Sequence, residues 1–135
     1  MPLVSLHYPS LALGLLAQYA AGAGWRVREH YFAFDFAERI GLDVYMMIAD
    51  ERHFQALLGE WIFAGLVYPR PEADAFGYLS EALLDGAAGL RGLVLTQAAL
   101  GARAAAPAFV DACADAIAAE APAVVGITSS FQQNM

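Results

Sequence analysis

In the first third of the chain, hydrophobic patterns typical of strands stand on both sides of a pattern typical of a helix. Residues 2–6 form a short apolar run that predicts a strand, and residues 11–23 predict a helix capped by Ser10. Residues 25–32 alternate, so that Arg28, His30 and Phe32 share one face of a second predicted strand. A strand, a helix and a strand within about 30 residues favour a βαβ unit and a parallel sheet.

The middle of the chain carries helical patterns. Helices are predicted over residues 35–40, 44–67 (with a break near Asp50), 78–84, 90–100 and 106–120. Gly41 would end the first of these helices, and Pro107 suits the first turn of the last. The last helix has an apolar stripe made by Phe109, Val110, Cys113, Ala114 and Ile117. A minimal crossover needs only about a dozen residues, so this block predicts a long helical insertion into the sheet.

Small hydroxyl residues follow the third predicted strand, over residues 123–128. Thr128, Ser129 and Ser130 stand where a parallel strand delivers its carboxyl end, a place where side chains of this size can contact a ligand. Ser130 and Gln133 also match a capping box, so the same residues can simply cap a helix. Both interpretations stay open.

The loop after the first predicted strand occupies the equivalent position. His7, Tyr8 and Ser10 are therefore candidate ligand-binding residues, although a single loop histidine is more often just exposed. Asp35 and Glu38, near the end of the second predicted strand, fit an ordinary helix start better than a contact to a ribose hydroxyl.

Together these patterns predict an α/β fold: a Rossmann-like, three-layer parallel sheet with a long helical insertion. The pattern of strand, turn and helix breaks off at Met135. We therefore expect residues 1–135 to be the front part of a larger domain that is incomplete at its C-terminal end.

Composition narrows the function. Hydrophobic residues make up 59% of the chain, yet no stretch approaches the roughly 20 apolar residues of a spanning helix, so no membrane is expected. Because so much of the chain is apolar, we expect further chain or a partner to cover part of its apolar surface.

Charge and cysteine content exclude further classes of function. The net charge is −7 and the seven basic residues, all arginines, are scattered along the sequence, which argues against nucleic-acid binding. Cys113, the single cysteine, excludes an internal disulfide or an iron–sulfur cluster made by this chain alone, and a cytoplasmic setting is expected.

Familiar cofactor motifs are absent from the sequence. Neither G-x-G-x-x-G nor a P-loop occurs, and D-x-H-x-x-G, the motif whose histidine binds cobalt in base-off cobalamin domains, does not surround His7, His30 or His53.

Four segments nevertheless resemble a known family. They are Pro-Ser-Leu-Ala-Leu-Gly-Leu-Leu at 9–16, Phe-Asp-Phe-Ala-Glu-Arg-Ile-Gly at 34–41, Leu-Gly-Glu-Trp-Ile-Phe-Ala at 58–64 and Val-Gly-Ile-Thr-Ser-Ser-Phe-Gln-Gln-Asn at 125–134. In this order they resemble the N-terminal region of the radical S-adenosylmethionine proteins that mature ribosomally made peptides, the cobalamin-dependent C-methyltransferase-like group. Members of that group commonly bind cobalamin without D-x-H-x-x-G.

The resemblance implies a cobalamin-binding Rossmann-like domain in front of a radical S-adenosylmethionine barrel, which acts on a peptide substrate. Thr128, Ser129, Ser130 and Gln132 would then lie at the corrin or its nucleotide tail. S-adenosylmethionine and a 4Fe-4S cluster would belong to the barrel, whose C-x-x-x-C-x-x-C motif this chain lacks. Residues 1–135 alone would not be catalytic and would bind cobalamin weakly or not at all. Two alternatives remain: a non-catalytic α/β partner-binding module, and another nucleotide-binding Rossmann domain.

Overall fold

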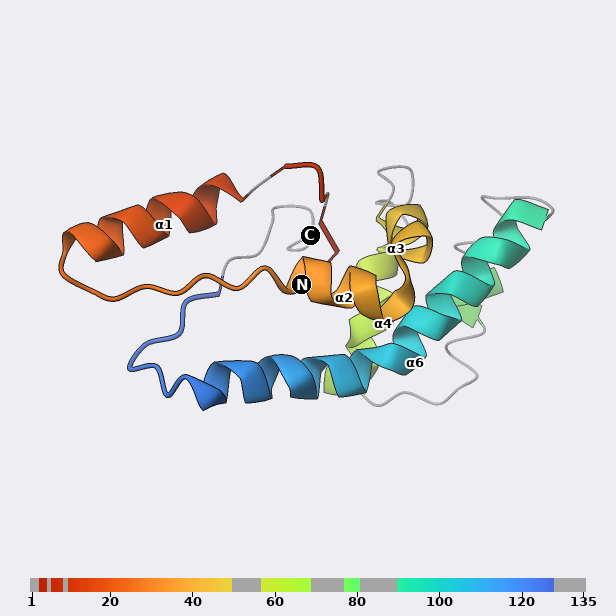
Figure 1. Ribbon diagram of the computed structural model, residues 1–135. Helices are drawn as coiled ribbons and strands as arrows, with labels where there is room; N and C mark the ends of the chain where they lie inside the picture. Colours follow the sequence, from red (N-terminus) through yellow and green to blue (C-terminus); the bar gives the residue numbers. More distant parts are fainter. Residues whose placement is uncertain are drawn as a thin grey trace.

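Helices form the architecture of the protein. The computed structural model describes residues 3–4, 6–8, 10–49, 57–68, 77–80 and 90–127. Its helices are α1 (Leu11–Gly22), α2 (Phe32–Ile40), α3 (Leu42–Ile48), α4 (Leu58–Val67) and α6 (Leu90–Ala119), and residues 77–80 are also helical (Figure 1). None of the described residues lies in a β-strand. The predicted α/β fold, a Rossmann-like parallel sheet, is therefore wrong.

The three predicted strands are absent from the described residues for two different reasons. A strand of a parallel sheet is buried on both faces and is apolar throughout, whereas residues 25–31 alternate with charged side chains. This segment is extended but pairs with no strand, and Trp25 is 56% exposed. The described residues of 2–6 form a turn, and residues 123–127 run exposed without a strand partner. Short apolar runs of this kind do not distinguish a strand from other structure.

Most of the predicted helices are confirmed. Helix α1 begins after Ser10, whose Oγ accepts a hydrogen bond from the Leu13 amide at 3.2 Å. Helix α2 is longer than predicted because it begins at Phe32, and it ends at Gly41 as expected. The predicted helix over 44–67 is two helices, α3 and α4; the residues around Asp50 lie outside the described part.

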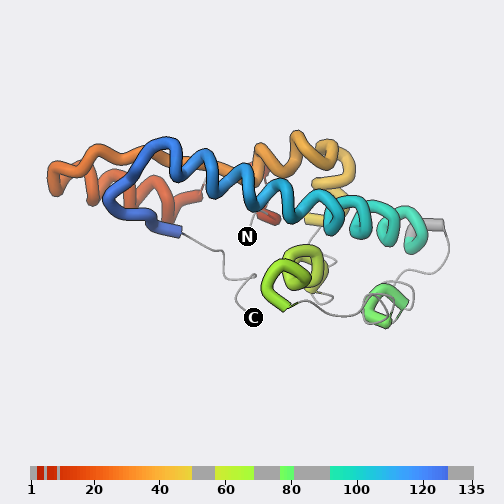
Figure 2. The backbone as a smooth tube through the Cα atoms, turned by 90° about the horizontal axis from the view of Figure 1, so that it is seen from below, coloured from red at the N-terminus to blue at the C-terminus, as the bar shows by residue number. Residues whose placement is uncertain are grey.

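The core lies where α2, α3 and α4 surround the first half of α6. Figure 2 shows α2 and α3 on one side of α6 and α4 on the other. The buried residues are Ala33, Phe36, Ala37, Tyr45, Ile48, Leu58, Ile62, Phe63, Leu79, Leu95, Ala99, Ala102, Ala106 and Phe109. Phe36 is at the centre, with its ring 4.7 Å from that of Phe109 and 5.3 Å from that of Phe63. Alanines on α6 let the other helices approach its axis closely.

Helix α6 continues through a proline. Two separate helices were predicted here, with Pro107 in the first turn of the second, but one helix of 30 residues spans both. A proline inside a helix removes one hydrogen bond and bends the axis, and Figure 1 shows α6 changing direction near its middle. The bend divides the helix by burial as well: of the predicted stripe only Phe109 is buried, while Val110 is 41% exposed.

Three side chains stack between α4, α6 and the helical residues 77–80. The ring of Trp61 is stacked on that of Tyr78, with centroids 5.1 Å apart, and the Arg103 guanidinium lies 4.3 Å from the centre of the Trp61 ring. Arg103 also donates a hydrogen bond to the Trp61 carbonyl. Burial, with a smaller contribution from Glu60, raises the pKa of Tyr78 to about 12, so its hydroxyl stays neutral at physiological pH.

A glycine makes room for this arginine, which gives a testable prediction. A Cβ atom on Gly65 would lie 2.8 Å from Nη2 of Arg103, whereas a Cβ on Gly101 would meet nothing within 4 Å. Either Gly→Ala change gains about 0.5–1 kcal/mol of helix stability. Gly65→Ala also displaces the guanidinium from Trp61, losing about as much again. In urea unfolding followed by circular dichroism, we expect Gly101→Ala to raise the free energy of unfolding. Gly65→Ala should leave the free energy of unfolding unchanged or lower it. Equal gains in both variants would contradict the packing.

Helix α1 stands apart from this core. It has no buried residue, although it is apolar and carries no charge, and it belongs to none of the closely packed helix pairs. Leu11 is 76% exposed and Tyr19 is 79% exposed. Burial among the described residues therefore does not explain why α1 is so apolar.

Candidate functional site

An open groove lies between the N-terminal turn, α2 and α3. Its volume is about 520 Å³, and it is lined by Leu6, His7, Phe34, Ala37, Glu38, Leu42 and Met46. Apart from His7 and Glu38 the lining is apolar, which is the usual form of a small-molecule site: an apolar surface with a few polar groups that fix orientation. The groove volume also falls within the range of such sites, roughly 300–1,000 Å³.

Two helical pairs build the walls of the groove. Phe34 and Glu38 are four residues apart on α2, and Leu42 and Met46 are four apart on α3, so each pair shares one helix face. Gly41 joins the two helices with a φ of 92°. An L side chain rarely adopts this conformation, so glycine at this position lets α3 turn back beside α2.

The third wall is held in place by a buried tyrosine. Tyr45 of α3 is fully buried, and its hydroxyl donates to the Val4 carbonyl at 2.8 Å and lies 2.9 Å from the Val4 amide, which donates to it. These two bonds fix the chain two residues before Leu6 and three before His7. Burial raises the pKa of Tyr45, so the hydroxyl remains protonated and able to donate.

Only one of the described ligand-binding candidates lines the groove. His7 does so, whereas Tyr8, its neighbour, is 80% exposed and outside the lining. The Ser10 hydroxyl is engaged in capping α1, so for this residue helix capping is confirmed. The candidates Thr128, Ser129, Ser130 and Gln132 lie outside the described residues.

Glu38 lines the groove, although the sequence patterns did not select it as a ligand-binding candidate. It was interpreted as part of a helix start, yet it follows Phe34 by four residues and shares its face. The spacing of four residues between Phe34 and Glu38 is the sequence pattern that could have placed Glu38 beside the groove. The carboxylate can accept hydrogen bonds at the rim of an otherwise apolar surface.

Other chemistry is scarce among the described side chains. No group of three or more His, Cys, Asp or Glu residues in the described ranges could hold a metal ion. Cys113 is half-buried against the core, and burial, assisted by the Asp35 carboxylate, raises the pKa of its thiol. A thiol with a raised pKa is a poor nucleophile at neutral pH, which agrees with a packing role.

One described helix passes a simple test for a membrane span. Residues Gly92–Ala119 of α6 are long and apolar enough to cross a bilayer, and 33% of the most apolar window is buried inside the structure. Core helices of soluble proteins pass the same test, and the first half of α6 forms the core of this fold. The observation therefore carries little weight.

Comparisons with protein-family models, with curated proteins and with solved structures found no match.

Proposed function

We propose that this chain is the N-terminal, cofactor-binding segment of a cobalamin-dependent radical S-adenosylmethionine enzyme that C-methylates a ribosomally synthesised peptide. The observation that carries the proposal is the set of four family-like segments at residues 9–16, 34–41, 58–64 and 125–134. Its partners are the radical S-adenosylmethionine part of the same protein and the peptide substrate. A Rossmann-like sheet is not part of the proposal, because the described residues are helical.

The groove supports the proposal through its lining. Of the four segments, 34–41 supplies Phe34, Ala37 and Glu38 to the groove, and 9–16 begins two residues after His7. A flat, largely apolar macrocycle fits an apolar surface of this kind, and the amide groups at its edge can donate to the Glu38 carboxylate. Because cobalamin with its nucleotide tail is larger than an ordinary small ligand, the groove would hold one part of it.

In this proposal the groove residues bind and orient the cofactor. Cobalamin, when bound, would carry the methyl group. His7 and Glu38 would orient it by hydrogen bonding, while Phe34, Leu42 and Met46 would exclude water from one face. No step of the reaction is assigned to a side chain of this segment, so its role is to bind and orient.

The test is a titration of the complete protein, including the radical centre, with hydroxocobalamin followed by the corrin absorbance. Ser129→Trp and Ser130→Trp place a bulky ring in the predicted cofactor turn, and His7→Ala removes the imidazole from the groove. We expect each to weaken binding by roughly tenfold, which is the effect of about 1.4 kcal/mol. Asp115→Trp, which adds the same ring on an exposed face of α6, is the control. Unchanged affinity in both serine variants would refute the assignment of the turn, and no binding to the unsubstituted protein would refute the function.

A second candidate function is a non-catalytic, helical partner-binding module. Helix α1 favours it, because it carries no charge and none of its residues is buried, and a helix with this composition usually covers another apolar surface. The titration distinguishes the two functions, since only the first predicts a shifted corrin spectrum.

A further inference from the structure

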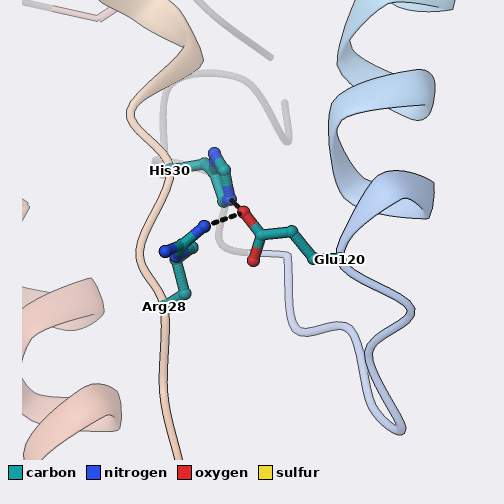
Figure 3. Close-up of polar contacts among 3 residues, drawn as sticks. All are labelled: Arg28, His30 and Glu120. Carbon is teal, nitrogen blue, oxygen red and sulfur yellow. Dashed lines mark hydrogen bonds and ion pairs between the residues drawn. The ribbon is translucent and has the colours of Figure 1, made fainter.

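Three charged or titratable side chains from distant parts of the sequence meet outside the groove. Nη1 of Arg28 donates to Oε1 of Glu120 at 2.8 Å, and Nε2 of His30 lies 3.0 Å from the same oxygen (Figure 3). Arg28 and His30 belong to the extended residues 25–31, whereas Glu120 directly follows α6. The cluster thus joins segments 90 or more residues apart in the sequence.

The extended segment presents both partners on one face. Residues two apart in an extended chain point to the same side, so Arg28 and His30 face α6 together. The ring of His30 also stacks on that of Phe32, the first residue of α2, with centroids 5.3 Å apart. Glu29, which alternates with Arg28 and His30, instead accepts a hydrogen bond from the Tyr31 hydroxyl at 2.9 Å.

Glu120 stands at an unfavourable place for an acidic residue. The C-terminal end of a helix carries a partial negative charge, so a carboxylate there weakens the helix unless cations offset it. Arg28 supplies that cation: its hydrogen bond and its charge, with a smaller contribution from the neighbouring His30, hold the pKa of Glu120 below its usual value. The carboxylate therefore serves the contact between segments rather than the helix itself.

The backbone next to Glu120 is strained. Ala121 has a φ of 45°, a left-handed conformation that residues other than glycine rarely adopt, and Pro122 follows it. Such a conformation persists where surrounding contacts hold it. The strained turn directs the chain away from α6 immediately after Glu120 and leaves its side chain facing the extended segment (Figure 3).

The segment that this cluster holds is otherwise loosely attached. Residues 10–31, here called the N-terminal hairpin, comprise α1 and the extended segment that returns beside it (Figure 1). Helix α1 has no buried residue and is not closely packed on another helix. Both ends of the hairpin adjoin the groove, since His7 shortly precedes it and Phe34 shortly follows it.

We propose that Arg28, His30 and Glu120 form a charge-dependent clasp that fixes the N-terminal hairpin beside the end of α6. Opening the clasp frees the hairpin to move as a strap whose two ends border the groove. Gly24, with a φ of 86°, makes the turn between α1 and the extended segment, so the two parts of the hairpin follow one another closely. The clasp does not depend on which ligand occupies the groove.

Limited digestion with chymotrypsin tests the clasp in the full chain. Trp25 and Tyr31 lie on either side of Arg28 and His30, and mass spectrometry can follow cleavage after each of them at pH 8. We expect Glu120→Gln to accelerate this cleavage roughly threefold, the range of an exposed ion-pair network. Asp115→Asn, which neutralises another exposed carboxylate of α6, should leave it unchanged. Cleavage after the buried Phe36 reports global unfolding and should not change in either variant.

Charge reversal distinguishes a direct pair from a general charge effect. Arg28→Glu and Glu120→Arg should each accelerate cleavage after Trp25 and Tyr31, and the double variant should restore the original rate. Equal rates for Glu120→Gln and Asp115→Asn would overturn the proposal. It would also be overturned if the double variant were cleaved as fast as the single variants, or if cleavage after Phe36 rose in parallel.

Discussion

Replacing Phe36 with alanine is expected to cause the largest loss of stability of any single change considered for this protein. Phe36 is fully buried and its ring contacts those of Phe63 and Phe109, while that of Tyr45 lies 6.5 Å away, edge to face. Truncating a phenylalanine in a packed core costs about 3–5 kcal/mol, because the apolar contacts are lost and a cavity remains. Since small domains are stable by only about 5–15 kcal/mol, this single change consumes a large share.

Urea unfolding and near-ultraviolet circular dichroism would measure this effect. Phe34→Ala is the matched control, because Phe34 lies on the same helix but is 54% exposed. We expect it to cost less than about 1 kcal/mol. Similar losses for the two variants would mean that α2 does not present Phe36 to α4 and α6.

Removing the Tyr45 hydroxyl is expected to have the second largest effect. Tyr45→Phe keeps the buried ring but deletes the group that bonds to both the carbonyl and the amide of Val4. Leaving partly buried backbone groups without these bonds costs about 1–3 kcal/mol. Tyr19→Phe, at a tyrosine that is 79% exposed, should change stability by less than about 0.5 kcal/mol.

The same variant should alter the response to alkaline pH. Burial raises the pKa of Tyr45 above that of an unfolded tyrosine, about 10. The stabilising effect of the protonated hydroxyl is therefore complete below pH ~10 and is lost as the pH rises towards the folded pKa. Tyr45→Phe should consequently show a shallower loss of stability above pH ~10 than the unsubstituted protein. An identical slope would show that Tyr45 titrates as though it were exposed.

Local signals in the sequence predicted local structure well. Ser10 followed by an apolar stretch identified the start of α1, and Gly41 identified the end of α2, because caps and helix ends depend on neighbouring residues. Pro107 misled the prediction for the opposite reason. The preference of proline for a first turn is local, but packing of the first half of α6 against three helices sustains one continuous helix through it.

The sheet and the groove depended on contacts that a single sequence does not display. The alternation over residues 25–31 is real, since Arg28 and His30 share a face, yet that face meets a helix end instead of a neighbouring strand. His7 was selected as a residue at the end of a strand. It lines the groove for another reason: Tyr45, about 40 residues later in the chain, binds the turn at Val4.

The position of Glu120 also makes the second half of α6 a molecular ruler. Phe109 is anchored in the core, and the helix then runs exposed towards Glu120, so the number of residues between them sets both a length and an angle. Each residue advances a helix by about 1.5 Å and turns it by about 100°. One inserted residue would shift Glu120 little along the axis but would rotate it away from Arg28. A whole added turn would restore the angle but carry Glu120 about 5.4 Å along the axis, so this half of α6 preserves the contact with Arg28 only near its present length.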